Sequence, residues 1–266
     1  MKVGFIGAGN MASAMIGGIL NSKLLSPSNI IASAKTDKTL DSIKEKYEIN
    51  TTKDSVSLVK ECDIVVVAVK PYVYEEVLKQ IKDYIGNEKI IVTIAAGVTI
   101  KSVEEIIGND KKIIRTMPNT PALVNCGMSS LSLNKNICEQ DINAVKTIFD
   151  SFGKSQIVEE SLIDVVIGAS GSSPAYAFMF IEAMADCAVS YGMKREMAYE
   201  FCAQSLMGAA KMVLETKKHP GELKDMVCSP GGTTIQAVKT LENEGMRSAV
   251  INGMASCIEK SIEMSK

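Results

Sequence analysis

Short apolar runs alternate with amphipathic segments over about the first 150 residues of the chain. Runs rich in Val and Ile, such as 3–6 and 64–69, are typical of buried parallel strands. The segments between them carry apolar residues at helical spacing, so the pattern predicts βαβ units and a doubly wound sheet. The expected strands are 3–6, 30–33, 64–69, 90–94, 112–115 and 129–133, and the expected helices are 11–20, 40–47, 73–85, 103–107 and 140–152.

The pattern changes near residue 162, where strand-like runs end and Gly, Ala and Met become frequent. Ser173 as N-cap, Pro174 at the first helical position and Gly192 as terminator predict a long helix over 174–191. We therefore expect an α/β domain over residues 1–160 and an all-helical domain over 161–266. Small residues and methionines on helices that cover no sheet indicate burial against another subunit. The further expected helices are 195–216, 234–243 and 247–264.

A glycine-rich turn joins the first expected strand to the first expected helix. In the pattern G-x-G-x-x-G/A, Gly7 permits a tight turn and Gly9 lets the backbone approach a pyrophosphate. Ala12 at the third position keeps the helix close to the strand. The N–H groups at the helix start then favour a negatively charged ligand. This turn predicts a nicotinamide dinucleotide cofactor.

The end of the second expected strand bears on which dinucleotide binds. NAD-binding proteins place an Asp or Glu there to hold the ribose 2′-hydroxyl. In this chain Ser33, Lys35 and Thr36 occupy the strand end, and Asp37 lies further into the loop. A cation and hydroxyls suit a 2′-phosphate, so we expect NADPH to be preferred, with NADH possible.

Charge and cysteine usage exclude several classes of protein. The net charge of −2, without a basic stripe, argues against nucleic-acid partners. The longest apolar segment, 175–189, contains Glu182 and Asp186, so we expect no membrane span. Seven dispersed cysteines and a single histidine argue against a metal site and against disulfides. A soluble, cytoplasmic protein is expected.

Three segments of the second half contain candidate chemistry. His219 precedes Pro-Gly between two expected helices, which favours a loop residue over a catalytic acid. Residues 170–174 and 229–234 each combine glycines and hydroxyls with a following helix, so each is a possible anion site. Thr233 and Thr234 are the candidates for contact with a ligand.

Six segments taken together resemble the pyrroline-5-carboxylate reductase family over essentially the whole chain. They are 4–12, 68–71, 95–98, 115–121, 171–176 and 229–234, and the last is the most specific. The resemblance implies NAD(P)H-dependent reduction of a cyclic imino acid, 1-pyrroline-5-carboxylate, to L-proline. It also implies a Rossmann domain followed by a helical dimerisation domain, in homo-oligomers that are dimers or decamers built from dimers.

The resemblance also implies roles for individual residues. Thr234 would be catalytic, because a hydroxyl on the ring nitrogen suffices for a substrate that is already electrophilic. The implied substrate-binding residues are Glu160, Ser229, Gly231, Gly232, Thr233 and Thr234. The implied cofactor-binding residues are Gly7, Ala8, Gly9, Asn10, Met11, Ser33, Lys35, Thr36, Ser55, Ala68, Val69, Lys70, Pro71, Ala95, Ala96, Met117, Pro118 and Asn119.

Some positions depart from the family pattern. Ala34 stands where some members have a serine near the 2′-phosphate, Ser55 where some have an asparagine, and Ser173 replaces a glycine. Two alternatives remain open. A β-hydroxyacid dehydrogenase would carry a lysine on the first long helix of the second domain, where this chain has none before Lys194. A non-catalytic NADP-binding sensor would need the first domain alone.

Overall fold

The computed structural model describes residues 1–264, and their contacts divide the chain into two compact units. The first contains Met1–Ser172 together with residues 257–264, and the second is Ser173–Ser256. This geometric division falls later than the functional division expected at residue 160. The contact of Glu160 with Arg115 in β6 and that of Ser170 with Asn119 after β6 explain the difference, because they hold this segment in the first unit.

The first unit is built on one eight-stranded sheet. Its order is β3-β2-β1-β4-β5-β6-β7-β8, and every pair is parallel except β6 with β7. The strands are β1 (Val3–Ile6), β2 (Ile30–Ser33), β3 (Asn50–Thr52), β4 (Ile64–Val67), β5 (Ile90–Thr93), β6 (Lys112–Met117), β7 (Gly127–Leu133) and β8 (Gly153–Ile157).

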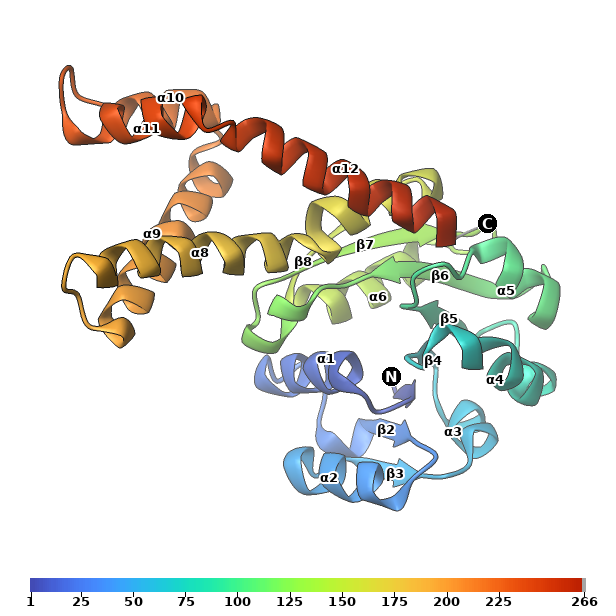
Figure 1. Ribbon diagram of the computed structural model, residues 1–266. Coiled ribbons are helices and arrows are strands. Elements are labelled where there is room, and N and C mark those ends of the chain that lie inside the picture. Colours follow the sequence, from blue (N-terminus) through green and yellow to red (C-terminus); the bar gives the residue numbers. More distant parts are fainter. Residues whose placement is uncertain (265–266) are drawn as a thin grey trace. The chain divides into compact units, whose positions relative to one another are not determined.

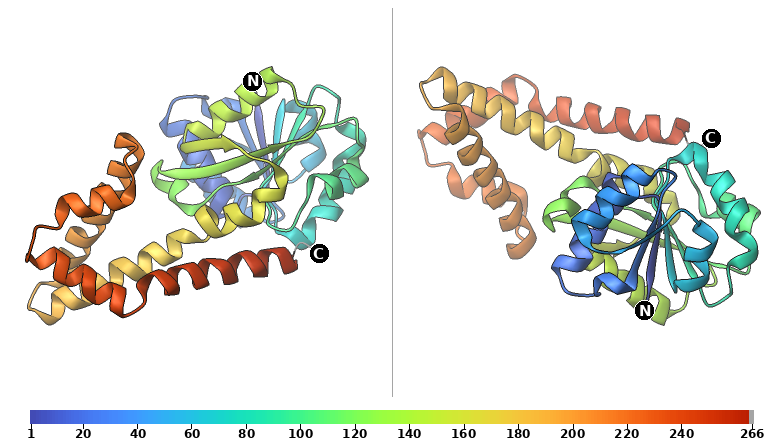
Figure 2. Two further views of the ribbon diagram at one scale, coloured as in Figure 1. Left: turned by 90° about the horizontal axis from the view of Figure 1, so that it is seen from above. Right: turned by 90° about the horizontal axis from the view of Figure 1, so that it is seen from below.

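Helices cover both faces of this sheet (Figures 1 and 2). The apolar cluster on one face contains residues of α1, α2 and α6, and the cluster on the other face contains residues of α3, α4 and α5. Two covered faces explain why the central strands are apolar without interruption. These helices are α1 (Asn10–Asn21), α2 (Asp37–Tyr47), α3 (Ser55–Glu61), α4 (Tyr74–Ile81), α5 (Ile100–Ile107) and α6 (Glu139–Asp150).

The strand order reverses direction between β1 and β4. The chain runs outward from β1 to β2 and β3, then crosses back to place β4 on the other side of β1. In open α/β sheets, ligands bind in the crevice at the carboxyl ends of the strands beside such a reversal. The loops that follow β1 and β4 therefore mark the expected cofactor site, and the predicted doubly wound fold is confirmed.

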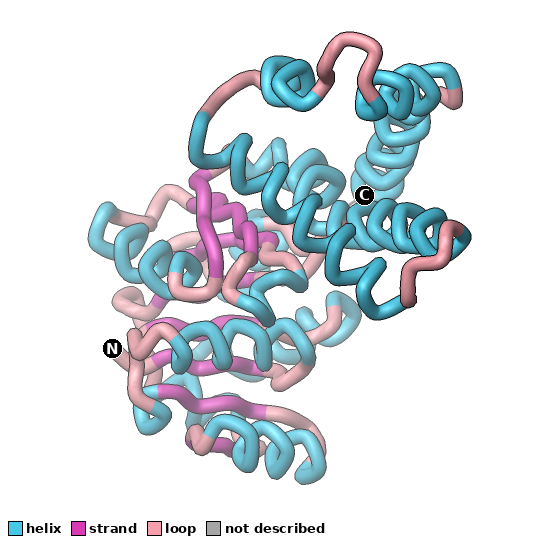
Figure 3. Tube along the Cα trace, turned by 90° about the vertical axis from the view of Figure 1, so that its left-hand side faces the viewer, coloured by secondary structure: helices cyan, strands magenta, loops and turns pink. Residues whose placement is uncertain are grey.

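The second unit is helical, as expected. Its helices α8 (Ser173–Ser190) and α9 (Arg195–Thr216) pack against each other, and α10 (Pro220–Val227) and α11 (Thr233–Asn243) follow. The last helix, α12 (Met246–Met264), begins in this unit and ends in the first. Figure 3 shows helices joined by loops in this part of the chain.

The start of α8 differs from the sequence-based expectation. Ser173 is its first residue and not a cap, because α7 (Ile163–Val166) and the π-helical turn Ile167–Gly171 lead into it. The Ser172 N–H donates to the Ile167 carbonyl at 2.8 Å, which continues the helical hydrogen bonding. The preceding helical turn therefore provides acceptors for backbone N–H groups that a capping side chain would otherwise satisfy.

Large apolar side chains of the second unit lie exposed on its helices. Ala185 is the one buried residue of α8, and Ala198 is the one buried residue of α9. Exposed apolar area of this extent marks a surface that another molecule covers. The exposed side chains include Phe178, Met179, Phe201, Met207, Leu214, Val250 and Ile251.

One helical run among residues 1–264, Glu160–Ser190, is long and apolar enough to cross a membrane, and 11% of its most apolar window is buried. Length and composition alone are weak support for a membrane span. Low burial is equally expected for a helix whose apolar face meets a second subunit.

Asp141 forms part of the capping box at the start of α6. Its Oδ2 accepts hydrogen bonds from the Cys138 N–H at 3.0 Å and from the Cys138 thiol, and its Oδ1 lies 2.8 Å from Lys112 Nζ. Burial alone would raise the pKa of this carboxyl, but the bonds from Lys112 and Cys138 outweigh it and hold the pKa below its ordinary value of 3.8. The carboxylate therefore stabilises the fold at neutral pH, and this stabilisation is lost as the pH falls through the folded-state pKa.

Asp141→Asn is expected to lower the free energy of unfolding at pH 7 by about 1–3 kcal/mol, because a charge-assisted buried network is weakened. Urea midpoints of variant and parent at one protein concentration measure the loss, which should shrink as the pH approaches 3. The control is Glu75→Gln, which removes an exposed pair with Lys79 and should change little. A loss of the same size at pH 3 and pH 7 would contradict this role of the carboxylate.

Candidate active site

The glycine turn after β1 requires glycine at its first position. Gly7 has φ +99°, and a Cβ there would lie 2.6 Å from the Ala68 carbonyl oxygen. The Gly7 N–H donates to the Ser33 carbonyl at 2.8 Å, and the Ala68 N–H donates to the Ile6 carbonyl at 2.7 Å. The loops after β1, β2 and β4 are therefore held together at the reversal in strand order.

The start of α1 suits a pyrophosphate. Gly9 is the N-cap with φ −78°, no side chain caps the helix, and its first turn contains no acidic residue. A Cβ on Gly9 would meet no heavy atom within 4 Å, so the space beside this backbone is open. The exposed Asn10 and half-buried Met11 begin the helix beside it. Uncapped N–H groups and open space fit a phosphate ligand.

Four predicted residues lie at or beside the carboxyl end of β2. Ser33 is buried, and its hydroxyl lies 3.2 Å from the Ser55 hydroxyl. Thr36 caps α2 by accepting from the Thr39 N–H at 3.3 Å. The exposed Lys35 has its Nζ 3.5 Å from Glu76 Oε1. The structure thus brings Ser33 and Ser55 together, while Thr36 and Lys35 already have partners.

Tyr74 joins the carboxyl ends of β4 and β5, a link that no sequence motif indicates. Its hydroxyl donates to the Val67 carbonyl and accepts from the Ile94 N–H at 3.2 Å. Burial raises the pKa of this hydroxyl above its ordinary value, so it remains a neutral donor. Tyr74 therefore fixes the spacing between the two segments that carry predicted cofactor residues, Ala68, Val69, Lys70 and Pro71 after β4 and Ala95 and Ala96 after β5.

Asn119 organises the loop after β6. Its Nδ2 donates to the Ser170 carbonyl at 2.9 Å, and its Oδ1 accepts from the Met128 N–H at 2.9 Å. The amide is thus engaged within the first unit at both ends. These two hydrogen bonds hold the loop in place, and the buried Met117 and Pro118 precede Asn119 on the same segment.

Glu160 is anchored by one carboxylate oxygen. Its Oε1 lies 2.9 Å from Arg115 Nη1 and accepts from the Ile100 N–H at 2.8 Å, at the start of α5. The Arg115 side chain is 5% exposed and that of Glu160 is 32% exposed. Among residues 1–264 no hydrogen bond to Glu160 Oε2 is formed. A fixed, partly exposed carboxylate with one unused oxygen can bind a cation or an N–H donor.

The predicted substrate loop lies in the second unit. Gly231 has φ +68°, and the Gly232 N–H donates to the Ser229 carbonyl at 3.0 Å. Gly232 is the N-cap of α11, without a side-chain cap or an acidic residue in the first turn. Thr233 and Thr234 are the first two residues of that helix. Two hydroxyls therefore stand beside uncapped N–H groups, which suits a carboxylate ligand.

His219 has a structural role. Its Nδ1 accepts from the Gly221 N–H at 3.0 Å, so it is the N-cap of α10. This accounts for the one histidine of the chain without a catalytic function. Within residues 1–264, no group of three or more His, Cys, Asp or Glu side chains is arranged to hold a metal ion.

Comparison with known proteins matches both parts of the chain. A family model described as pyrroline-5-carboxylate reductase dimerisation matches residues 160–264, and one described as NADP oxidoreductase, coenzyme F420-dependent, matches residues 2–97. The exposed apolar helices thus lie in the part of the chain that matches a dimerisation domain, and this match supports a homo-oligomer.

Relatives align over the full length. The Escherichia coli pyrroline-5-carboxylate reductase is 48% identical over 100% of this chain and 98% of its own. A pyrroline-5-carboxylate reductase from Coxiella burnetii has a TM-score of 0.92 at 34% identity, covering 100% and 98% of the two chains. The Plasmodium falciparum enzyme, solved with NADP bound, has a TM-score of 0.89 at 34% identity and the same coverage. These full-length similarities, together with the glycine turn and the loop before α11, show that the chain belongs to the pyrroline-5-carboxylate reductase family.

Proposed function

We propose that the chain reduces 1-pyrroline-5-carboxylate to L-proline with NAD(P)H, the final step of proline synthesis, and that the loop before α11 binds the substrate. The observation that carries the proposal is the pair of hydroxyls, on Thr233 and Thr234, at an uncapped helix start. The full-length relatives named for this reaction support it.

The cofactor, when bound, supplies the hydride that reduces the C=N bond. A protonated imine is already an electrophile, so the chain has to orient the substrate more than to protonate it. We assign the Thr234 hydroxyl to the ring nitrogen. Thr233 and the N–H groups at the start of α11 are assigned to the substrate carboxylate, with the help of Ser229, Gly231 and Gly232 in shaping the loop.

The first unit holds the cofactor in this proposal. Residues 7–11 bind the pyrophosphate, Ser33, Lys35, Thr36 and Ser55 surround the adenosine ribose, and residues 68–71 flank the adenosine half. Ala95, Ala96 and residues 117–119 lie near the nicotinamide. The cation and hydroxyls after β2 support a preference for NADPH over NADH.

Glu160 is assigned to the substrate through its second carboxylate oxygen. Glu160→Gln keeps an acceptor for Arg115 and Ile100 but removes the charge, so kcat/KM for 1-pyrroline-5-carboxylate is expected to fall about 10- to 100-fold. Steady-state kinetics should show an unchanged KM for NADPH. Glu159→Gln, at the exposed neighbouring residue, is the control and should behave as the parent. An unchanged substrate KM and kcat in Glu160→Gln would remove Glu160 from the site.

The activity is tested by following NADPH and NADH oxidation with 1-pyrroline-5-carboxylate, and separately with β-hydroxyacids in the oxidative direction. Turnover of the imine alone is the expected result. Binding of nucleotide without turnover of any substrate would favour a sensor. Light scattering on the same sample distinguishes a dimer from a decamer built from dimers. We also expect the protein to be located in the cytoplasm.

A further inference from the structure

A cavity of about 320 Å³ lies between the start of α1 and the length of α2. Gly9, Asn10 and Ser13 line it from the glycine turn and α1, and Lys38, Thr39 and Lys46 line it from α2. All of these residues belong to the first unit. The cavity therefore adjoins the helix start that suits a pyrophosphate.

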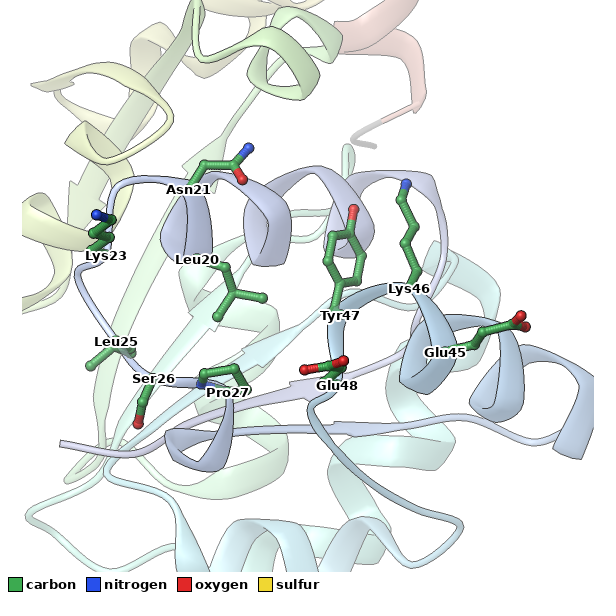
Figure 4. Close-up of a pocket in the computed structure, with 10 residues that line it drawn as sticks. All are labelled: Leu20, Asn21, Lys23, Leu25, Ser26, Pro27, Glu45, Lys46, Tyr47 and Glu48. Carbon is green, nitrogen blue, oxygen red and sulfur yellow. The ribbon is translucent and has the colours of Figure 1, made fainter.

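The lining of this cavity is positively charged. Two lysines contribute to it, no Asp or Glu does, and the uncapped N–H groups of α1 add partial positive charge. A second cavity, of about 580 Å³, lies at the opposite ends of the same two helices (Figure 4). There Glu45 and Glu48 offset Lys23 and Lys46. Of these two cavities, the one at the glycine turn is suited to an anion.

Lys38 differs from the neighbouring lysines in its partners. Lys35 Nζ lies 3.5 Å from Glu76 Oε1, and Lys53 Nζ lies 2.8 Å from Asp37 Oδ2. Among residues 1–264, Lys38 forms no ion pair, and the contact of Lys46 is with the Tyr47 ring, 4.9 Å from its centroid. An anion at Lys38 therefore displaces no carboxylate, whereas an anion at Lys35 competes with Glu76.

We propose that Lys38 is the principal determinant of NADPH preference and binds the 2′-phosphate within this cavity, with Thr39 and Lys46 as its neighbours. This inference rests on the proposed cofactor site. Residues that follow the second strand meet the ribose 2′-position in dinucleotide-binding sheets, and α2 begins four residues after β2 and lines this cavity. Lys38, in the first turn of α2, is among the residues that line it.

A comparison of two nucleotide fragments isolates the contribution of the 2′-phosphate to binding. Calorimetry on the full-length protein compares adenosine 2′,5′-bisphosphate with adenosine 5′-monophosphate. Lys38→Gln is expected to weaken binding of the bisphosphate about 10- to 100-fold and to leave the monophosphate unchanged, because one charge-assisted bond is lost. Lys38→Arg keeps the charge and should retain most of the difference.

Kinetics give a second readout. The ratio of kcat/KM for NADPH to that for NADH should fall about 10- to 100-fold in Lys38→Gln, with NADH-driven turnover retained. Lys44→Gln, an exposed residue of α2 outside the cavity, is the control for loss of one positive charge.

Two outcomes would overturn the proposal: an unchanged fragment ratio in Lys38→Gln, or an equal loss in Lys44→Gln. A loss confined to Lys35→Gln would assign the phosphate to Lys35. If the parent enzyme reduces the imine with neither nucleotide, the proposed reaction is wrong. The proposal for Lys38 is tested separately, because fragment binding is measured without the imine substrate.

Discussion

Thr234→Ala is expected to lower kcat at least about 100-fold, because the hydroxyl that orients the imine nitrogen is removed. The KM for NADPH should not change, since Thr234 is assigned to the substrate alone. Thr234→Ser retains the hydroxyl and is expected to recover most of the activity. Steady-state kinetics with saturating NADPH measure both.

His219 provides the comparison for Thr234. His219→Ala removes the acceptor that caps α10 and is expected to lower thermal stability while leaving kcat close to that of the parent. His219→Asn keeps a capping acceptor and should leave stability unchanged as well. If His219→Ala reduced kcat as much as Thr234→Ala, the assignment of the chemistry to the threonine would be wrong.

Gly7→Ala is expected to destabilise the first unit by about 2–4 kcal/mol and to weaken NADPH binding at least about 100-fold. The positive φ disfavours any side chain, and the added Cβ would approach the Ala68 carbonyl to 2.6 Å. The shift needed to relieve this contact moves the turn away from the pyrophosphate. Urea unfolding and fluorescence titration with NADPH measure the two effects.

Gly9→Ala is expected to lower NADPH affinity without changing the stability of the fold. Gly9 has a negative φ and open space around the position of a Cβ, so the substitution should leave the urea midpoint unchanged. The new methyl group would occupy the space assigned to the pyrophosphate, so NADPH affinity should still fall. Undiminished affinity in Gly9→Ala would show that the phosphates bind elsewhere.

The central sheet could be predicted because its strands are continuous apolar runs. β1 and β2 have the predicted bounds, since burial on both faces leaves few polar residues in them. The apolar pattern does not predict β3, β8 or α3. β3 and β8 are edge strands with partly exposed residues, and their pairing with β2 and β7 selects the strand conformation more than their own sequence does.

The start of α10, in the second half of the chain, is not predicted from the sequence. The sequence around His219 predicts a loop, yet α10 starts there. Pro220 is favoured at the first position of a helix, so it could have indicated the start of α10. The preceding His219 does not support that interpretation, because histidine is not among the preferred N-cap residues.

Gly7 and Gly231 could be proposed from sequence because their positive φ angles favour glycine, whereas Gly9 could be proposed from the spacing of the motif and its role toward a pyrophosphate. The anchoring of Glu160 could not. Its partners Arg115 and Ile100 lie 45 and 60 residues away, and no spacing rule connects them. Tyr74 and Asn119 are similar, since each links strand ends that only the folded sheet brings together.

The hydrogen bond between Ser261 and Asp164, at 2.5 Å, spans 97 residues of chain. Because residues 257–264 belong to the first unit, that unit is a discontinuous domain with the whole second unit inserted between its two parts. Closing so long a loop costs entropy that local contacts do not recover. The nucleotide-binding sheet can therefore form early from its own strands, whereas the packing of the end of α12 against α7 is a late, long-range event in folding.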